Sequence, residues 1–115
     1  MKKILLIDDY EPTAITLQFL CESAGHDCTY ETSGKKALAL GTTDFELILV
    51  DIHLPHTSGI ELSPLLREKW PHAKIVGYTA DPDLLSADEK KAFDGVENKN
   101  LDAKAVERLF EKWLN

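Results

Sequence analysis

Apolar and polar positions follow two periods along the chain, one typical of buried strands and one typical of amphipathic helices. Short apolar runs predict strands at 3–7, 45–50 and 74–78, and the alternation adds a weaker strand at 27–30 and a short one at 95–97. Between these runs, apolar residues recur at the i, i+3, i+4, i+7 spacing of one helix face. This spacing predicts helices over about 12–24 and 101–114, and local signals between the strands predict further helices at 33–40, 59–69 and 86–93.

Local signals support the predicted helix ends. Pro12 suits a first helical turn, and Gly25 suits the end of that helix. Ser33 can cap the short second helix, and the segment 86–89 has the spacing of a capping box. Pro64 lies inside the third predicted helix, past its first turn, so we expect a kink or a late start there.

Five strands that alternate with five helices predict an α/β fold with a parallel sheet covered on both faces. The length of 115 residues corresponds to about one domain with its own core. We therefore expect residues 1–115 to form a single domain. Sheets of this type bind ligands beyond the carboxyl ends of their strands, so the residues that follow each strand carry the functional interest.

Composition and charge exclude several classes of protein. Thirteen basic and twenty acidic residues give a net charge of −7, which disfavours a surface built for nucleic-acid phosphates. The apolar runs are strand-length, so we expect neither membrane insertion nor a signal peptide. Cys21 and Cys28 are too few for a disulfide framework. They favour two reduced, half-buried thiols in a cytoplasmic protein, with one disulfide as the alternative.

Polar residues that follow the predicted strands can form one site. Asp8 and Asp9 follow the first strand, Asp51 the third, Thr79 the fourth and Lys99 the fifth. Three clustered carboxylates repel one another, and a divalent cation relieves that repulsion. Oxygen ligands without nearby cysteines favour Mg²⁺. Asp51, the single carboxylate that ends the central strand, is positioned to attack phosphorus as a nucleophile.

These motifs together resemble the receiver domains of two-component response regulators. The matching segments are Asp8-Asp9, Asp51-Ile52-His53-Leu54-Pro55 with Gly59 behind it, Thr79-Ala80, and Lys99. They occur in order at the right places in the alternation, and the resemblance extends from Lys3 to Leu114. It implies a flavodoxin-like (βα)5 three-layer sandwich, with a five-stranded parallel sheet in the order 2-1-3-4-5.

The resemblance also implies a metal site. Asp9 would bind Mg²⁺ directly, and Asp8 would bind it through water. Asp51 would provide the third side-chain contact, and His53 would provide its backbone carbonyl.

The remaining roles that the resemblance implies concern the phosphoryl group. Asp51 would accept it from a phosphohistidine, and Lys99 would pair with Asp51 beforehand and with the phosphoryl oxygens afterwards. Thr79 would turn inward to bond the phosphoryl group, with the Ala80 N–H beside it. In this family such a protein signals and is not a turnover enzyme, apart from its own phosphorylation and dephosphorylation.

The implied partners are a histidine kinase or a histidine phosphotransfer protein, and an output protein that the sequence leaves unknown. We expect no output domain, no direct contact with nucleic acid, and a monomer or a weak dimer. Output would then proceed through protein–protein contacts or phosphorelay. A fragment of a larger regulator or hybrid kinase is an alternative.

Two positions depart from the family pattern. Val96 stands where the family usually has an aromatic residue, and Asn100 stands where a proline usually follows the lysine. Both departures motivate an alternative, a receiver-like module that binds its partner without phosphorylation. A phosphatase of the aspartate-nucleophile type is disfavoured because His53 stands where those enzymes have a second aspartate. We also expect His53 and Asp81, at the mouth of the site, to tune hydrolysis of phosphorylated Asp51.

Overall fold

Five parallel strands and the helices between them make up the computed structural model, which describes residues 2–41, 44–99 and 102–114. The strands are β1 (Lys3–Ile7), β2 (Asp27–Glu31), β3 (Leu47–Asp51), β4 (Lys74–Thr79) and β5 (Gly95–Asn98). The helices are α1 (Glu11–Ser23), α2 (Gly34–Leu38), α3 (Gly59–Lys69), α4 (Ala87–Lys90) and α5 (Ala103–Leu114), with a 3-10 turn η1 (Pro82–Leu84).

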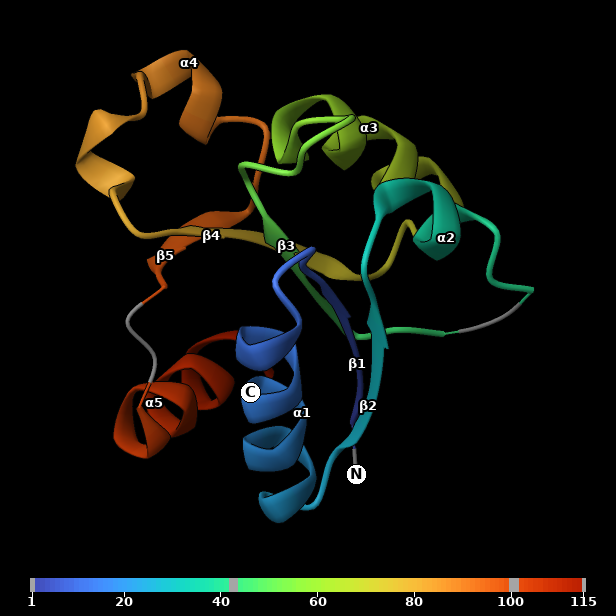
Figure 1. Cartoon of the computed structure of the whole chain (residues 1–115), viewed down its shortest axis with the longest axis vertical. Coiled ribbons are helices and arrows are strands. Elements are labelled where there is room, and N and C mark those ends of the chain that lie inside the picture. Colours follow the sequence, from blue (N-terminus) through green and yellow to red (C-terminus); the bar gives the residue numbers. More distant parts are fainter. Residues whose placement is uncertain (1, 42–43, 100–101, 115) are drawn as a thin grey trace.

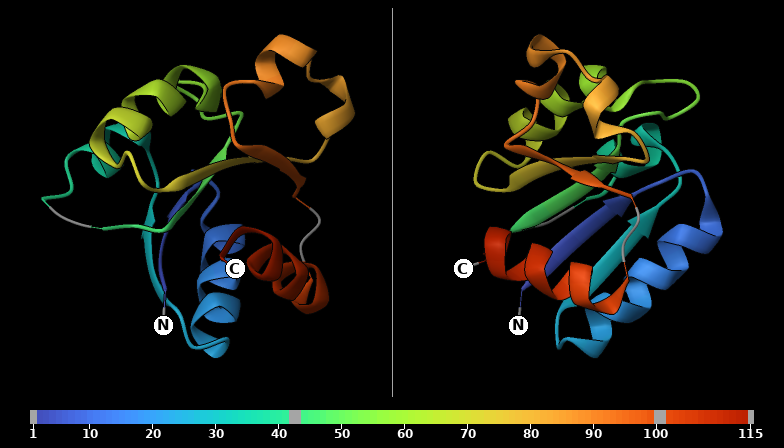
Figure 2. Two further views of the ribbon diagram at one scale, coloured as in Figure 1. Left: turned by 180° about the vertical axis from the view of Figure 1, so that it is seen from behind. Right: turned by 90° about the vertical axis from the view of Figure 1, so that its left-hand side faces the viewer.

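The strand order is β2-β1-β3-β4-β5, and every pairing is parallel. This confirms the predicted α/β fold and the 2-1-3-4-5 sheet. Helices α1 and α5 cover one face of the sheet, and α2, α3 and α4 lie on the other side (Figures 1 and 2). The strand order reverses between β1 and β3, so the carboxyl ends of these two neighbours form the ligand-binding edge expected of such a sheet.

Alternate residues of the strands supply two separate apolar cores. On one face, Leu5, Ile48 and Ile75 pack with α2, α3 and Phe93. On the other face, the next residue of each of these strands packs with α1 and α5. Because the central residues of β1, β3 and β4 are buried on both faces, they form nearly continuous apolar runs, with polar residues at the strand ends. Two fully buried layers hold the central strands rigidly, and this fixes the positions of the residues at their ends.

Most helix boundaries agree with the local signals. Helix α1 has proline in its first turn, and Gly25 follows the helix with φ of 89°. The Ser33 side chain caps α2 by accepting the N–H of Lys36. Helix α3 begins at Gly59 and contains Pro64, so a late start at the proline is wrong.

The segment after β4 differs from its prediction. The capping box of Ser86 and Glu89 is present, but α4 ends at Lys90 rather than at Phe93. The helix stops because Asp94 binds the edge of β4 through two hydrogen bonds. Its N–H donates to the Ile75 carbonyl (2.8 Å), and its carboxylate accepts the Ile75 N–H (2.7 Å). This pairing draws the chain down to the sheet and starts β5.

The third strand also differs by a small shift. It begins at Leu47, two residues later than predicted, and it includes Asp51. Phe45, which precedes the strand, packs edge-on against Trp70 with ring centroids 5.1 Å apart, so it is a core residue outside the ladder. Among the helices of the described residues, none is both long and apolar enough to cross a membrane.

Gly59 brings the start of α3 against the end of β3. A Cβ at this position would lie 2.7 Å from the Asp51 carbonyl oxygen and 2.8 Å from Ile52 Cα. Both neighbours are backbone atoms, which cannot move aside as a flexible side chain can. The missing side chain therefore lets α3 begin directly behind Asp51.

We expect Gly59→Ala to lower the free energy of unfolding by about 1–3 kcal/mol, the usual cost of overpacking. Urea denaturation measures this change. Gly41→Ala is the matched control, because nothing lies within 4 Å of a Cβ built there. Equal stability of the two variants would contradict the close contact between α3 and β3.

Candidate functional site

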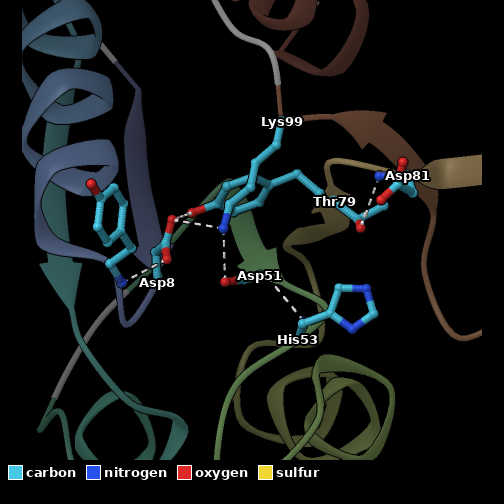
Figure 3. A network of polar contacts seen from close by, with 8 residues as sticks. Asp8, Asp51, His53, Thr79, Asp81 and Lys99 are labelled. Carbon is cyan, nitrogen blue, oxygen red and sulfur yellow. Dashed lines mark hydrogen bonds and ion pairs between the residues drawn. The ribbon is translucent and has the colours of Figure 1, made fainter.

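The polar residues predicted from the strand ends converge at one edge of the sheet (Figure 3). Asp8 and Asp9 directly follow β1, and Asp51 is the last residue of β3. Thr79 ends β4, and Lys99 follows β5. Because neighbouring parallel strands end at the same edge, residues far apart in the sequence meet there.

Three carboxylates form the centre of the site. One oxygen from each of Asp8, Asp9 and Asp51 lies within 4.8 Å of the other two. Asp8 is 0% exposed and Asp51 is 3% exposed, while Asp9 is exposed. The cluster therefore has two buried carboxylates and one carboxylate that faces solvent. An ion can enter from the solvent-facing side.

Lys99 is the cation that balances part of this charge. Its Nζ lies 2.9 Å from Asp51 Oδ2 and 3.6 Å from Asp8 Oδ2. Burial alone would lower the pKa of Lys99, but the hydrogen bond to Asp51 and the attraction of both carboxylates outweigh it and raise the pKa. Lys99 therefore stays charged at neutral pH.

Asp8 is held from two sides. Its Oδ1 accepts the Tyr10 N–H at 2.9 Å, and its Oδ2 accepts the Tyr78 hydroxyl at 2.6 Å. Burial raises the pKa of Asp8, although the hydrogen bonds from Tyr78 and Tyr10 and the charge of Lys99 oppose that shift. The same burial, together with the charge and hydrogen bond of Asp8, raises the pKa of Tyr78 far above its usual range, so the phenol stays neutral and donates.

Asp51 and Thr79 are held by the loops that follow them. The His53 N–H donates to Asp51 Oδ1 at 3.0 Å, which leaves Oδ2 for Lys99. The Thr79 hydroxyl accepts the Asp81 N–H at 3.3 Å, and the Thr79 carbonyl accepts the Lys99 N–H at 2.8 Å. Thr79 is thus bonded to its own loop and to the residue after β5.

The other predicted positions lie around this centre. Ala80 follows Thr79 and is exposed, and the side chain of His53 is also exposed. Val96 is half-buried and packs against the core on the α3 side of the sheet. Asn100, the second departure from the family pattern, lies outside the described residues.

The two cysteines lie away from the site. Cys21 of α1 and Cys28 of β2 are free thiols in the same apolar core. Both are buried rather than half-buried as predicted. Contact with Cys21 and burial raise the pKa of Cys28 far above its usual range, so this thiol is unreactive.

Tyr78 is a site residue that the sequence analysis missed. The sequence pattern predicts it only as the last residue of a strand, 74–78. One general signal was present, because a tyrosine in a strand buried on both faces needs a hydrogen-bond partner for its hydroxyl. The sequence gives no means of identifying that partner as Asp8, which lies 70 residues away.

The residues present fit a hard divalent cation. When ionised, the three carboxylates and Lys99 carry a net charge of −2. The donors are all oxygens, which Mg²⁺ prefers, and one or two carboxylates are its usual protein ligands.

Comparisons with known proteins agree with this geometry. Residues 4–109 match the family described as response regulator receiver domain. The chain is 38% identical over 80 residues to the alkaline phosphatase synthesis transcriptional regulatory protein PhoP of Bacillus subtilis, a match that covers 69% of this chain and 33% of PhoP. The chain spans a third or less of the length of the first curated relatives it matches.

Solved structures share the fold over nearly the whole chain. A CheY-like receiver domain from Methylobacillus flagellatus has a TM-score of 0.84 and 29% identity, covering 97% of this chain and 98% of that one. The response regulator TrrA of Thermotoga maritima, in complex with Mg(2+)-BeF, has a TM-score of 0.86 and 26% identity. That match covers 98% of this chain and 99% of TrrA.

We expect Mg²⁺ to stabilise the folded protein, because the unfolded chain does not hold the carboxylates together. At ten times its dissociation constant, an ion that binds only the folded state adds about 1.4 kcal/mol. Urea denaturation with and without MgCl₂, at constant ionic strength, measures the effect.

Asp9→Asn should abolish most of this stabilisation, and the exposed Asp83→Asn should retain it. An equal gain in both variants would mean that Mg²⁺ acts on the surface charge in general and not at this cluster.

Proposed function

Because the chain belongs to the response regulator receiver domain family, we propose that Asp51 accepts a phosphoryl group with the help of Mg²⁺. The donor is a phosphohistidine of a histidine kinase or of a histidine phosphotransfer protein. Receiver domains are signalling modules, so the product is the phosphorylated protein itself. We propose that residues 1–115 form one such domain, which signals through protein–protein contacts or passes the phosphoryl group onward.

The observation that carries this proposal is the pairing of Asp51 with Lys99 beside the acidic cluster. Asp51 is 3% exposed, lies 2.9 Å from Lys99 and adjoins two further carboxylates. An aspartate without a function is more often solvated at the surface. A nucleophilic carboxylate needs these neighbours because the incoming phosphoryl group brings additional negative charge. The Mg(2+)-BeF complex of TrrA supports the same interpretation.

The chemistry is an in-line displacement at phosphorus. An Asp51 carboxylate oxygen forms the new O–P bond while the P–N bond of the phosphohistidine breaks, and the imidazole leaves with the electron pair of that bond. Asp9, Asp51 and the His53 carbonyl would hold Mg²⁺ directly and Asp8 would hold it through water, and the ion would supply positive charge for the phosphoryl oxygens. Lys99 neutralises a further oxygen, and the His53 N–H orients Asp51. Positioning and charge neutralisation carry most of the catalysis in such reactions.

Thr79 and Ala80 provide the proposed response to phosphorylation. The Thr79 hydroxyl now accepts the Asp81 N–H. Turning inward to a phosphoryl oxygen would break that bond and release the start of the loop that leads to η1. The Ala80 N–H would add a second donor to the phosphoryl group. A local change in charge would thereby change the conformation of a surface loop. A partner protein can bind the changed loop, as in other switches driven by phosphorylation.

Incubation with Mg²⁺ and acetyl phosphate should add one phosphoryl group to the wild-type protein and none to Asp51→Asn. Intact-protein mass spectrometry measures this directly. Asp83→Asn is the matched control, since it removes an exposed carboxylate outside the site and should be phosphorylated normally.

Phosphorylation of Asp51→Asn would refute the assignment of the acceptor. If the wild-type protein binds Mg²⁺ and gains no mass, even from phosphohistidine proteins, the phosphorylation-independent module is the better description. That module also predicts that Asp51→Asn leaves partner binding intact.

His53 and Asp81 should set the lifetime of phosphorylated Asp51. They follow Asp51 and Thr79 by two residues each and flank the mouth of the site (Figure 3). Replacing both with alanine should change the rate of dephosphorylation severalfold, because water must pass them to reach phosphorus. A slower rate would mean that Asp81 orients the water, and a faster rate that it repels it.

The matched control replaces His56 and Asp83, which are the same residue types further along each loop and are also exposed. Loss of mass over time measures both rates. An unchanged rate in the first pair would contradict the role of these two residues.

A further inference from the structure

Tyr78 contacts the acidic cluster from beneath, at a position that no established role of the site includes. It is the penultimate residue of β4 and is 0% exposed. Since neighbouring strand residues point to opposite faces, Tyr78 packs among the core residues on the α1 and α5 side, next to Thr79. Its hydroxyl nevertheless reaches the end of β1, where it donates to Asp8 Oδ2 at 2.6 Å.

The tyrosine contacts two members of the site at once. Lys99 Nζ lies 5.3 Å from the centroid of the Tyr78 ring, within the range of a cation–π contact. The hydroxyl binds Asp8 and the ring lies under Lys99. Tyr78 therefore contacts both groups whose charges must be correctly placed around Asp51.

The hydrogen bonds of Asp8 account for most of its orientation. A carboxylate has two oxygens and about four lone-pair positions. Tyr10 N–H occupies one position on Oδ1, and the Tyr78 hydroxyl occupies one on Oδ2. Lys99 lies at 3.6 Å from the same Oδ2 and binds it weakly. Without the phenol, this fully buried carboxylate would be oriented only by the Tyr10 N–H and by the longer contact with Lys99.

We propose that Tyr78 is a positioning residue for the Mg²⁺ site. Its hydroxyl fixes the Asp8 carboxylate in the orientation that the ion requires. This proposal rests on the proposed function, since it assumes that the acidic cluster holds Mg²⁺. Residues that hydrogen-bond a metal-binding side chain without touching the ion typically contribute about tenfold or more to metal affinity. Tyr78 contributes in this way without contacting the ion.

The test compares Tyr78→Phe with Tyr30→Phe. Tyr78→Phe keeps the ring under Lys99 and removes only the hydroxyl. Tyr30 packs against the same core, and among the buried side-chain polar atoms of residues 2–41, 44–99 and 102–114 its hydroxyl is the one without a hydrogen-bond partner. Removing that hydroxyl controls for the loss of a buried phenol oxygen in general.

Backbone amide chemical shifts, followed by NMR during MgCl₂ titration, give the dissociation constant of each variant. We expect Tyr78→Phe to weaken Mg²⁺ binding by about tenfold and Tyr30→Phe to leave it unchanged. In an Asp8→Asn background, Tyr78→Phe should have little further effect, because the hydroxyl acts through Asp8. An unchanged affinity in Tyr78→Phe, or equal weakening in Tyr30→Phe, would overturn the proposal.

A measurement on the wild-type protein covers the case in which Tyr78→Phe does not fold. With ¹³C-labelled tyrosine, the Cζ signal of Tyr78, which is bonded to Asp8, should shift on addition of Mg²⁺ by more than that of Tyr30, which has no hydrogen bond to the cluster. The absence of a Tyr78 shift at saturating Mg²⁺ would overturn the proposal. If instead the wild-type protein shows no Mg²⁺ binding and gains no phosphoryl group, the proposed function itself fails.

Discussion

Mutual repulsion of three carboxylates is the constraint on which the rest of this site depends. Asp8, Asp9 and Asp51 place oxygens within 4.8 Å of one another, and two of these residues are buried. A single ammonium group, that of Lys99, lies among them and pairs most closely with Asp51. The folded chain therefore keeps an uncompensated negative charge at one edge of its sheet. That charge is the physical reason for proposing a divalent cation, and with it a phosphoryl group, as the ligands of this site.

The fold supplies the energy that holds this repulsive arrangement together. The central strands β1, β3 and β4 are buried on both faces, between two apolar cores that face α1 and α5 on one side and α2 and α3 on the other. Their ends cannot move apart without disrupting both cores. Gly59 lets α3 start against the end of β3, and Asp94 fixes β5 to β4 by two hydrogen bonds. Asp8, Asp51 and Thr79 thus lie at the ends of the most deeply buried strands of the sheet.

Sequence patterns predicted the sheet and most of its helices because burial imposes its period on the chain. The apolar runs and the caps at Ser33 and Ser86 were sufficient for this. The errors lie where a tertiary contact outweighs a local signal. Helix α4 ends early because Asp94 pairs with Ile75, a contact that no local pattern encodes. Phe45 is apolar and buried, yet it packs against Trp70 outside the strand.

The family, the strand order that it implies and most of the polar residues at the strand ends can be inferred from local patterns along the chain. This was possible because the apolar runs of the first, third and fourth strands end at the aspartates and at Thr79, whereas Lys99 follows the short and mostly polar fifth strand. Only the tertiary structure decided how these residues interact. It placed Lys99 nearer to Asp51 than to Asp8, bonded the Thr79 hydroxyl to Asp81, and brought Tyr78 under the acidic cluster. Such contacts depend on distances of a few ångströms between segments up to 70 residues apart, and periodicity along the chain carries no information about them.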